Sequence, residues 1–435
     1  MEEVSRLELR LSPCKALRGE ITVSADKSIS HRALIFSSLA RGKSRVQNFL
    51  QAQDTCATLR CLGRLGVDIK SEKPGLIISG TGWEGLKEAD DVLDCGNSGT
   101  TMRLLAGLLA GRPFLSILSG DDSLHRRPMQ RVMEPLRMMG AAVYARQDGR
   151  APLVIMGKQL RGIEYRLPVA SAQLKTALLL AGLQAEGQTV LSEPQPSRDH
   201  SERMLSAMGA DLILTSDSIT LNPGRLLEPQ DFVVPGDISS AAYFMVAASL
   251  IPGSELLIKG VGVNPTRTGI IEVLRRMGAD IVLEHQQVVG GEPVADVLVR
   301  SAALHGTSVG GSIIPRMIDE VPILAVAMAA ADGESRIDDA GELRVKESDR
   351  LAAISTQLNK MGACVEELPQ GLLITGKPQH LRGAEVHSLG DHRIAMSLAV
   401  AALVARGETL LKGAEAVDIS FPRFWQLLES LTRNC

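Results

Sequence analysis

Six apolar helices, each preceded by a cluster of polar and charged residues, constrain the fold of this chain most. The clusters begin at positions 26, 96, 171, 235, 316 and 390 and read DKSISHR, GNSGTTMR, SAQLKT, PGDISS, RMIDE and GDHR. Each following helix is expected to end near a glycine: Gly42, Gly111, Gly187, Gly253, Gly333 or Gly407. These stops are 66 to 80 residues apart, so the pattern predicts six copies of a unit of about 72 residues.

A second, amphipathic helix follows in five of the units and ends at Gly66, Gly140, Gly209, Gly278 or Gly362, directly before a β-rich segment. Each unit is therefore predicted to run strand, buried helix, strand, amphipathic helix and two strands (βαβαββ). Three units can close around a pseudo-threefold axis with the buried helices inside and the sheets outside. The predicted fold is α/β, with two such inside-out barrel domains, a boundary near Pro235 and an active-site cleft between them. Ordinary two-layer α/β repeats remain an alternative.

Composition excludes several classes of protein. With a net charge of -3 and 3% aromatic residues, the 435-residue chain has neither a general basic field nor many stacking platforms for nucleic acid. The longest apolar runs are 11 residues, too short to span a membrane. The N-terminus resembles no signal peptide and the six cysteines form no CxxC pair, which predicts a cytoplasmic protein with reduced thiols and without a metal site.

The polar clusters predict sites for anions. A helix N-terminus carries partial positive charge and spare N–H groups, and cations such as Lys27 and Arg32 are unfavourable there unless an anion compensates. Lys346 and Arg350, four residues apart, form a like-charge pair that is unfavourable without an anion between them. Arg127 precedes a helix predicted to begin at Pro128. Solvated helix ends and plain N-caps are the simpler interpretation, but six such clusters favour a small substrate with several negative charges.

Two acidic residues stand out among these cations. Asp319 opens an apolar run and Glu347 lies between two basic residues. Asp319 is either a helix cap or a carboxylate held ionised by cations and able to act as a general base. The sequence contains no recognisable nucleophilic triad or metal-ligand spacing, so we expect neither a metal nor another cofactor.

The chain resembles the 5-enolpyruvylshikimate-3-phosphate (EPSP) synthases over nearly its whole length, and its bacterial class II members in detail. The motifs that carry the resemblance are DKSISHRA (26–33), GNSGTTMR (96–103), HRRPM (125–129), SAQLKTA (171–177), RVKESDR (344–350) and GDHRIAM (390–396). The resemblance implies an N-terminal domain of residues 22–236 inserted into a C-terminal domain of residues 1–21 and 237–435. It also implies transfer of the enolpyruvyl group of phosphoenolpyruvate to the 5-hydroxyl of shikimate 3-phosphate by addition and elimination, in the shikimate pathway.

The same resemblance assigns roles to individual residues. Catalysis falls to Asp319, Glu347 and Lys27. The residues implied to contact shikimate 3-phosphate are Lys27, Ser28, Arg32, Ser171, Gln173, Ser197, Arg198, Asp319 and Lys346. The residues implied to contact phosphoenolpyruvate, whose site glyphosate also occupies in this family, are Lys27, Asn97, Gly99, Arg127, Gln173, Arg350 and Arg393. We expect a monomer, with these two small molecules as its partners.

Departures from the family pattern and rival functions remain. Ala172 replaces a serine, Leu104 replaces a common proline, and Ile419 occupies the place of a lysine for which Lys412 is a weak substitute.

The nearest rival is the enolpyruvyl transferase that acts on UDP-N-acetylglucosamine. That enzyme usually has a cysteine in the stretch corresponding to residues 120–128, and this chain has none there. The other rival is a non-catalytic anion-binding repeat protein, which would not need both Asp319 and Glu347.

Overall fold

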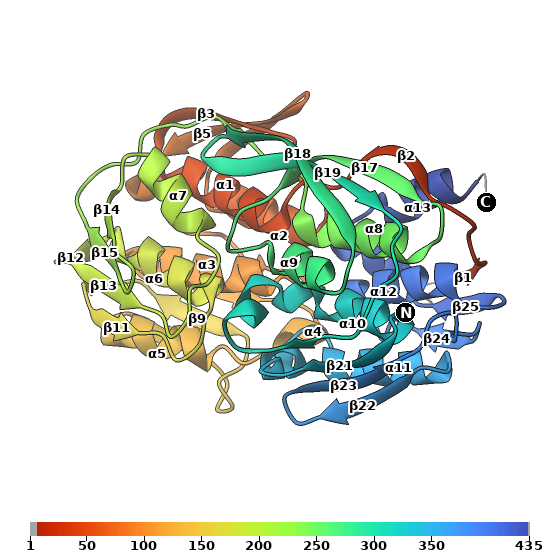
Figure 1. Ribbon diagram of the computed structural model, residues 1–435. Helices are drawn as coiled ribbons and strands as arrows, with labels where there is room; N and C mark the ends of the chain where they lie inside the picture. Colours follow the sequence, from red (N-terminus) through yellow and green to blue (C-terminus); the bar gives the residue numbers. More distant parts are fainter. Residues whose placement is uncertain (1–6, 434–435) are drawn as a thin grey trace. The chain divides into compact units, whose positions relative to one another are not determined.

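The computed structural model describes residues 7–433, which form two compact units (Figure 1). The N-terminal unit comprises Ala25–Val234 together with Val289–Glu292. The C-terminal unit comprises the described residues up to Ser24, then Pro235–Val288, and the chain from Pro293 onward. The divisions lie within three residues of those expected at 22 and 236, but the transfer of Val289–Glu292 to the N-terminal unit was not anticipated.

Apolar helices form the interior of each unit. The N-terminal unit buries α1 (Lys27–Leu39), α3 (Gly99–Leu109) and α6 (Ala172–Gly182), and α3 packs against α6. The C-terminal unit buries α8 (Ile238–Leu250), α10 (Val321–Ala330) and α12 (His392–Val404), which pack pairwise against one another. These helices are buried on nearly all sides, as expected of helices surrounded by protein.

The remaining helices are half exposed. Those of the N-terminal unit are α2 (Gln53–Arg64), α4 (Asp122–His125), α5 (Gln130–Met138) and α7 (His200–Ala207). Those of the C-terminal unit are α9 (Gly269–Arg276), α11 (Arg350–Lys360) and α13 (Phe424–Thr432). Short 3-10 turns lie at Trp83–Gly85, Gly311–Arg316, Ile318–Glu320, Gly341–Val345 and Ala414–Ile419. The α2, α5, α7, α9 and α11 helices are the predicted amphipathic ones, and the glycines that follow them have positive φ as expected.

The sheets repeat one topology. Three sheets have the orders β6-β7-β9-β8, β11-β13-β15-β14 and β20-β21-β23-β22, in which the first two strands are parallel and the last two form an antiparallel hairpin. Their strands are β6 (Leu93–Asp94), β7 (Leu115–Ser119), β8 (Ala142–Tyr144), β9 (Leu153–Met156), β11 (Glu164–Arg166), β13 (Thr189–Ser192), β14 (Asp211–Leu214), β15 (Ile219–Asn222), β20 (Ser308–Val309), β21 (Gly333–Ile337), β22 (Cys364–Leu368) and β23 (Gly371–Gly376). A two-stranded sheet pairs β10 (Leu160–Arg161) with β12 (Ala185–Glu186).

Three further sheets recruit a strand from a distant part of the chain. In β16-β3-β5-β4 the first strand is β16 from the end of the N-terminal unit, and in β18-β19-β17-β2 the strand parallel to β17 is β2 from near the N-terminus. In β1-β25-β24, β1 from near the N-terminus pairs antiparallel with β25 of the last repeat. These strands are β1 (Glu8–Leu11), β2 (Arg18–Thr22), β3 (Arg41–Gln47), β4 (Asp68–Glu72), β5 (Gly75–Thr81), β16 (Phe232–Val233), β17 (Glu255–Gly262), β18 (Asp280–Val289), β19 (Glu292–Arg300), β24 (Glu385–His387) and β25 (Thr409–Lys412).

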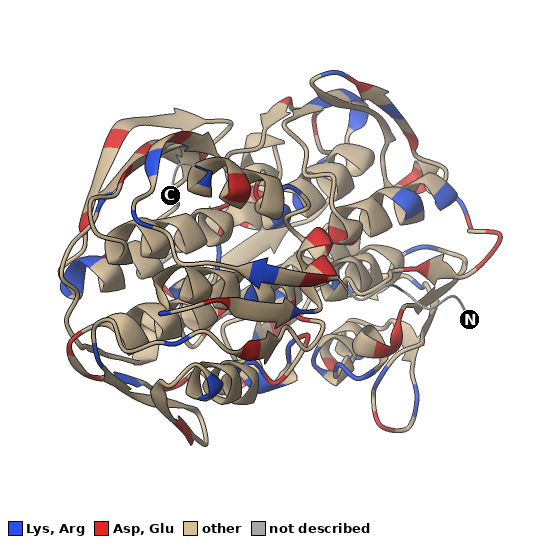
Figure 2. Ribbon diagram, turned by 90° about the vertical axis from the view of Figure 1, so that its right-hand side faces the viewer, with Lys and Arg blue, Asp and Glu red and all other residues tan. Residues whose placement is uncertain are grey.

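Charged residues of both signs are mixed along the chain. Figure 2 shows acidic and basic residues interspersed along the ribbon, in line with the small net charge.

Four cysteines in residues 7–433 are free thiols: Cys56, Cys61, Cys95 and Cys364. Cys14 is disulfide-bonded, which contradicts the expectation of reduced thiols at that residue. No helix in residues 7–433 is long and apolar enough to cross a membrane.

Candidate active site

The buried helices of the N-terminal unit begin with polar caps. Asp26, Ser98 and Ser171 cap α1, α3 and α6, and each side-chain oxygen accepts a hydrogen bond from the amide three residues on, at 2.8, 3.1 and 3.4 Å. Lys27 is therefore the first residue of α1, and its Nζ lies 2.7 Å from a carboxylate oxygen of Asp54. The caps fix where each helix starts, and so where its positive N-terminal end points.

Arg32 lies inside the N-terminal unit and is 2% exposed. Its Nε donates to Ser201 Oγ at 2.7 Å and its Nη2 to Thr176 Oγ1 at 2.8 Å, while Nη1 donates to the carbonyl of Ser28 at 3.0 Å. Burial lowers the pKa of Arg32 to about 10, although the nearby Glu202 raises it in part. Arg32 therefore joins α1, α6 and α7, and its implied contact with shikimate 3-phosphate stays a prediction.

Two guanidinium groups lie against Gly99, the first residue of α3. A Cβ added at Gly99 would come within 2.7 Å of Arg103 Nη1 and 2.8 Å of Arg127 Nη1. Arg127 is 7% exposed and lies between α4 and α5, because α5 begins at Gln130. The helix start predicted at Pro128 is therefore wrong: the segment after α4 turns first, and Pro128 forms an isolated bridge with Arg150.

Gln173 connects α6 to the first turns of α3. Its side-chain oxygen accepts from Arg103 Nη1 at 2.7 Å, and its amide nitrogen donates to Thr100 Oγ1 at 2.9 Å. Asn97, half-buried, directly precedes the cap of α3. Gln173, Asn97 and Gly99 are thus grouped around one helix start, and their implied contact with phosphoenolpyruvate stays a prediction.

The loop between β13 and α7 carries a second group. Arg198 Nη1 donates to Ser28 Oγ at 3.3 Å, which joins this loop to the start of α1. Ser197 is 5% exposed, and its Oγ has no hydrogen-bond partner among the described residues. A hydroxyl and a guanidinium on consecutive residues, next to a helix N-terminus, form a set of donors suited to phosphate.

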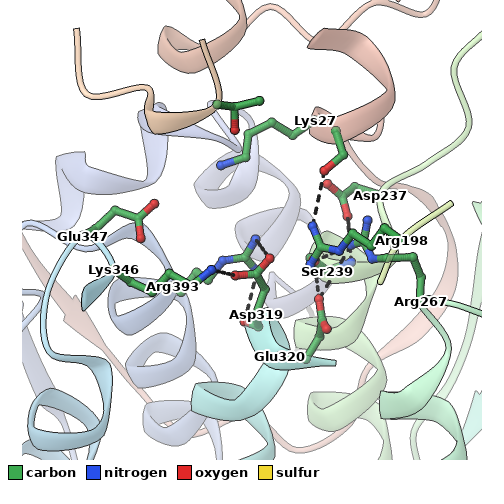
Figure 3. Close-up of polar contacts among 12 residues, drawn as sticks. Lys27, Arg198, Asp237, Ser239, Arg267, Asp319, Glu320, Lys346, Glu347 and Arg393 are labelled. Carbon is green, nitrogen blue, oxygen red and sulfur yellow. Dashed lines mark hydrogen bonds and ion pairs between the residues drawn. The ribbon is translucent and has the colours of Figure 1, made fainter. Parts of the chain in front are cut away.

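Asp319 lies at the centre of a cationic cluster in the C-terminal unit. Its carboxylate lies 3.2 Å from Arg350 Nη1, 3.6 Å from Lys346 Nζ and 3.7 Å from Arg393 Nη2. Figure 3 shows the Lys346 and Arg393 side chains directed toward this carboxylate. The N-cap of α10 is Glu320 rather than Asp319, so the geometry favours an ionised carboxylate over the helix-cap interpretation.

Arg350, 1% exposed, joins three carboxylates. Its Nε lies 2.8 Å from Asp391 and its Nη2 lies 2.5 Å from Glu347, in addition to the contact with Asp319. Burial lowers the pKa of Arg350, but Asp391, Glu347 and Asp319 outweigh it and hold that pKa above the ordinary value. Lys346 ends a 3-10 turn and Arg350 begins α11, so the two cations do not lie on one helix. The charges that compensate them belong to the protein.

A second buried network lies beside Asp319. Arg267 donates to Ser239 Oγ at 2.8 Å, and its Nη2 lies 3.3 Å from Asp237 and 3.8 Å from Glu320. Ser239 also donates to Glu320 (Figure 3). This network ties the start of α8 to the 3-10 turn that carries Asp319, and so fixes the backbone from which the Asp319 side chain extends.

Comparison with known proteins decides the family. Residues 11–428 match the family model of EPSP synthase (3-phosphoshikimate 1-carboxyvinyltransferase). Among curated relatives, the 3-phosphoshikimate 1-carboxyvinyltransferase of Syntrophomonas wolfei is 60% identical over 97% of this chain and 99% of its own, and that of Synechocystis sp. is 54% identical over 96% and 95%. The solved EPSP synthase of Acinetobacter baumannii superposes with a TM-score of 0.87 at 43% identity, covering 98% of both chains.

The chain belongs to the EPSP synthase family. It is an enzyme that transfers the enolpyruvyl group of phosphoenolpyruvate to shikimate 3-phosphate in the shikimate pathway. Its fold is the two-domain inside-out α/β fold of the EPSP synthases.

Sequence reasoning missed three residues in the neighbourhood of this EPSP synthase site. Arg103 bonds Gln173, Asp391 pairs with Arg350 and accepts from the Arg393 amide at 2.8 Å, and Arg267 supports the turn before α10. Arg103 and Asp391 lie inside the quoted motifs, so their position was a usable signal. Arg267 lies outside all of these motifs, and no pattern in its local sequence indicates a site residue.

Lys412, the weak substitute for the lysine missing at Ile419, lies in β25. Its Nζ is 2.7 Å from Glu385 on the neighbouring strand, and this hydrogen bond raises the pKa of Lys412. It therefore already serves as a cross-strand ion pair, and the structure gives it no link to the Asp319 cluster. Among residues 7–433, no group of three or more His, Cys, Asp and Glu side chains is arranged to hold a metal ion.

Proposed function

We propose that two groups of residues, one in each unit, act on the same pair of substrates. Asp319 carries this proposal, because it is a nearly buried carboxylate that faces three cations. Such a carboxylate is ionised and held in place, as a general base requires. We assign to Asp319 the proton of the 5-hydroxyl of shikimate 3-phosphate as that oxygen attacks C2 of phosphoenolpyruvate.

The remaining steps need an acid and cationic groups that bind phosphate. When the hydroxyl adds to C2, the methylene carbon takes up a proton; phosphate then leaves as a proton is lost from that carbon. Glu347, held by Arg350, and Lys27, held by Asp54, are the groups proposed for these transfers. Arg127, Arg350 and Arg393 stabilise the charge on the phosphate and carboxylate of phosphoenolpyruvate, together with Asn97, Gly99 and Gln173.

We propose a second set of residues for shikimate 3-phosphate. Its phosphate would meet Ser28, Ser171, Ser197 and Arg198, and Gln173, Lys346 and Asp319 would contact the ring substituents. Support comes from the contact between Arg198 and Ser28 and from the buried Ser197 hydroxyl that lacks a partner among the described residues. Ala172 supplies no hydroxyl, so Arg198 would compensate for the serine of other relatives.

The decisive assay measures phosphate released from phosphoenolpyruvate. We expect release that depends on shikimate 3-phosphate and does not occur with UDP-N-acetylglucosamine as the acceptor. Release with the nucleotide sugar, or release independent of any acceptor, would overturn the proposal. No particular observation on the structure favours either rival function.

The location and assembly of the enzyme complete the proposal. We infer a cytoplasmic enzyme that acts as a monomer and needs no cofactor, with a domain of residues 22–236 inserted into a domain of residues 1–21 and 237–435. Light scattering in solution tests the assembly, and a mass near 46.5 kDa is expected. A mass twice as large would contradict the monomer.

A further inference from the structure

A buried ion cluster lies beneath the loop that carries Ser197 and Arg198. Lys175, in the second turn of α6, places its Nζ 2.8 Å from Glu193 and 2.7 Å from Glu202. The side chains of these residues, which we call the Lys175 cluster, are 1%, 9% and 5% exposed. Glu193 directly follows β13, and Glu202 lies in the first turn of α7.

The Lys175 cluster is costly for a purely structural element. It places two carboxylates against one ammonium group, and the second oxygen of each, Glu193 Oε1 and Glu202 Oε2, is buried with no hydrogen-bond partner among the described residues. Buried ion pairs of this kind rarely stabilise a fold more than apolar side chains of similar volume. The cluster therefore calls for an explanation other than stability.

One of the two carboxylates, that of Glu193, contacts the loop that carries Ser197 and Arg198. Glu193 Oε2, the oxygen that accepts from Lys175, also accepts from the backbone N–H of Ser197 at 3.2 Å. This bond fixes the backbone at the residue whose hydroxyl is buried and has no partner in residues 7–433. The next residue, Arg198, contacts Ser28 at the start of α1.

The first turn of α7 holds the other end of the loop. Ser201 accepts from Arg32 and bonds Thr176, so it ties α7 to α1 and α6. Glu202 ties the same turn to Lys175. The loop between Glu193 and Ser201 is thus anchored at both ends to α6, the helix whose start carries Ser171 and Gln173.

We propose that Glu193, oriented by Lys175, is a positioning residue for the phosphate group of shikimate 3-phosphate. It holds the Ser197 amide so that the Ser197 hydroxyl and the Arg198 guanidinium face one phosphate. Lys175 fixes the orientation of the carboxylate through its ammonium group, 2.8 Å away. The inference rests on the proposed function, because it presumes the phosphorylated acceptor.

Three variants separate positioning from stability. Glu193→Met removes the acceptor for the Ser197 amide, whereas Glu193→Gln keeps a side-chain carbonyl that can accept from it. Glu202→Met is the matched control, because Glu202 is equally a buried partner of Lys175, while the carboxylate that accepts from Ser197 is that of Glu193. Each variant is measured for the KM of both substrates, for kcat, and for the Kd of shikimate 3-phosphate by calorimetry.

We expect Glu193→Met to raise the KM and Kd of shikimate 3-phosphate by about tenfold or more, the scale of losing a hydrogen bond to a charged group. The KM of phosphoenolpyruvate and kcat should change by less than about threefold on the same scale. Glu193→Gln should recover most of the affinity, and Glu202→Met should stay close to the wild type. The proposal is wrong if both substrates weaken equally, if the Gln and Met variants behave alike, or if Glu202→Met weakens binding as much as Glu193→Met.

Two further measurements keep the test decisive. If Glu193→Met does not fold, amide exchange of Ser197 in the wild-type enzyme replaces it: slow exchange without substrates is expected, and fast exchange overturns the proposal. Wild-type turnover is measured first. An enzyme that releases no phosphate refutes the proposed function itself, whereas an active enzyme with an insensitive Glu193 refutes the positioning role alone.

Discussion

Replacing Gly99 by alanine tests whether Arg127, which lies beside it, holds phosphoenolpyruvate. The new methyl group would lie 2.7 Å from Arg103 Nη1 and 2.8 Å from Arg127 Nη1, whereas ordinary contact begins at 3.4 Å. Each terminal nitrogen must therefore retreat by more than half an ångström. Both atoms are the ends of flexible side chains, and Gly99 has no left-handed backbone conformation, so the fold should tolerate the change within about 1 kcal/mol.

The effect on binding should be much larger than the effect on stability. A guanidinium–phosphate contact near 2.8 Å, lengthened by that amount, reaches the limit of a hydrogen bond. Losing such a bond costs roughly 1.5–3 kcal/mol, so the KM of phosphoenolpyruvate should rise about tenfold or more. Glyphosate is longer than phosphoenolpyruvate, so its inhibition constant should rise by a larger factor. The KM of shikimate 3-phosphate should change by less than about twofold on this scale.

Initial rates of phosphate release give all three constants, and thermal unfolding checks the fold. Gly63→Ala is the matched control, because it adds the same methyl group to a helix where no atom lies within 4 Å. The reasoning fails if Gly99→Ala leaves the KM of phosphoenolpyruvate unchanged. It also fails if the methyl group raises the glyphosate constant and that KM by equal factors, since Gly99 would then not distinguish the two ligands.

Three more variants test other parts of the site. Asp319→Asn should lower kcat by roughly 10²–10⁴ in a folded protein, and near-normal turnover would remove Asp319 from the chemistry. Arg127→Ala should raise the KM of phosphoenolpyruvate far more than that of shikimate 3-phosphate, while Arg126→Ala, its exposed neighbour, should change neither; equal loss for both substrates would contradict the assignment. Burial lowers the pKa of His31 to about 3 from 6.5. Between these pH values His31 binds a proton in the unfolded chain but not in the folded one, so the free energy of unfolding should fall as pH drops from about 6.5 toward 3. His31→Gln should flatten this slope by up to about 1.4 kcal/mol per pH unit, and His380→Gln, at an exposed site, should not; an unchanged slope in His31→Gln would refute the reasoning.

Much of the local structure was predictable because it depends on short segments. An apolar run behind a capping residue forms a buried helix wherever it occurs, as Asp26 and Ser98 demonstrate. A glycine at the end of an amphipathic helix adopts positive φ for steric reasons, as at Gly66 and Gly278. The error at Pro128 has the same origin, since proline suits a first helical position but also suits the turn that the chain makes there.

The motifs likewise located most of the candidate site residues, but not their partners. That Lys346 and Arg350 need compensating charge follows from electrostatics alone. The sequence suggested a ligand as the source, whereas the structure supplies Asp319, Glu347 and Asp391. Asp319 and Asp391 lie 31 and 41 residues from Arg350 in the sequence, and no local pattern specifies such pairs.

The sequence by itself determined six repeats, the order of helices and strands within them, and the motifs that assign the family. Tertiary structure alone decided that β2 pairs with β17 and β16 with β3, and that β1 completes the last sheet. It also decided that Glu193 reaches the Ser197 amide above Lys175. Periodicity and capping act over a few residues and can be read along the chain, whereas strand pairing and buried ion pairs depend on which distant segments packing brings together.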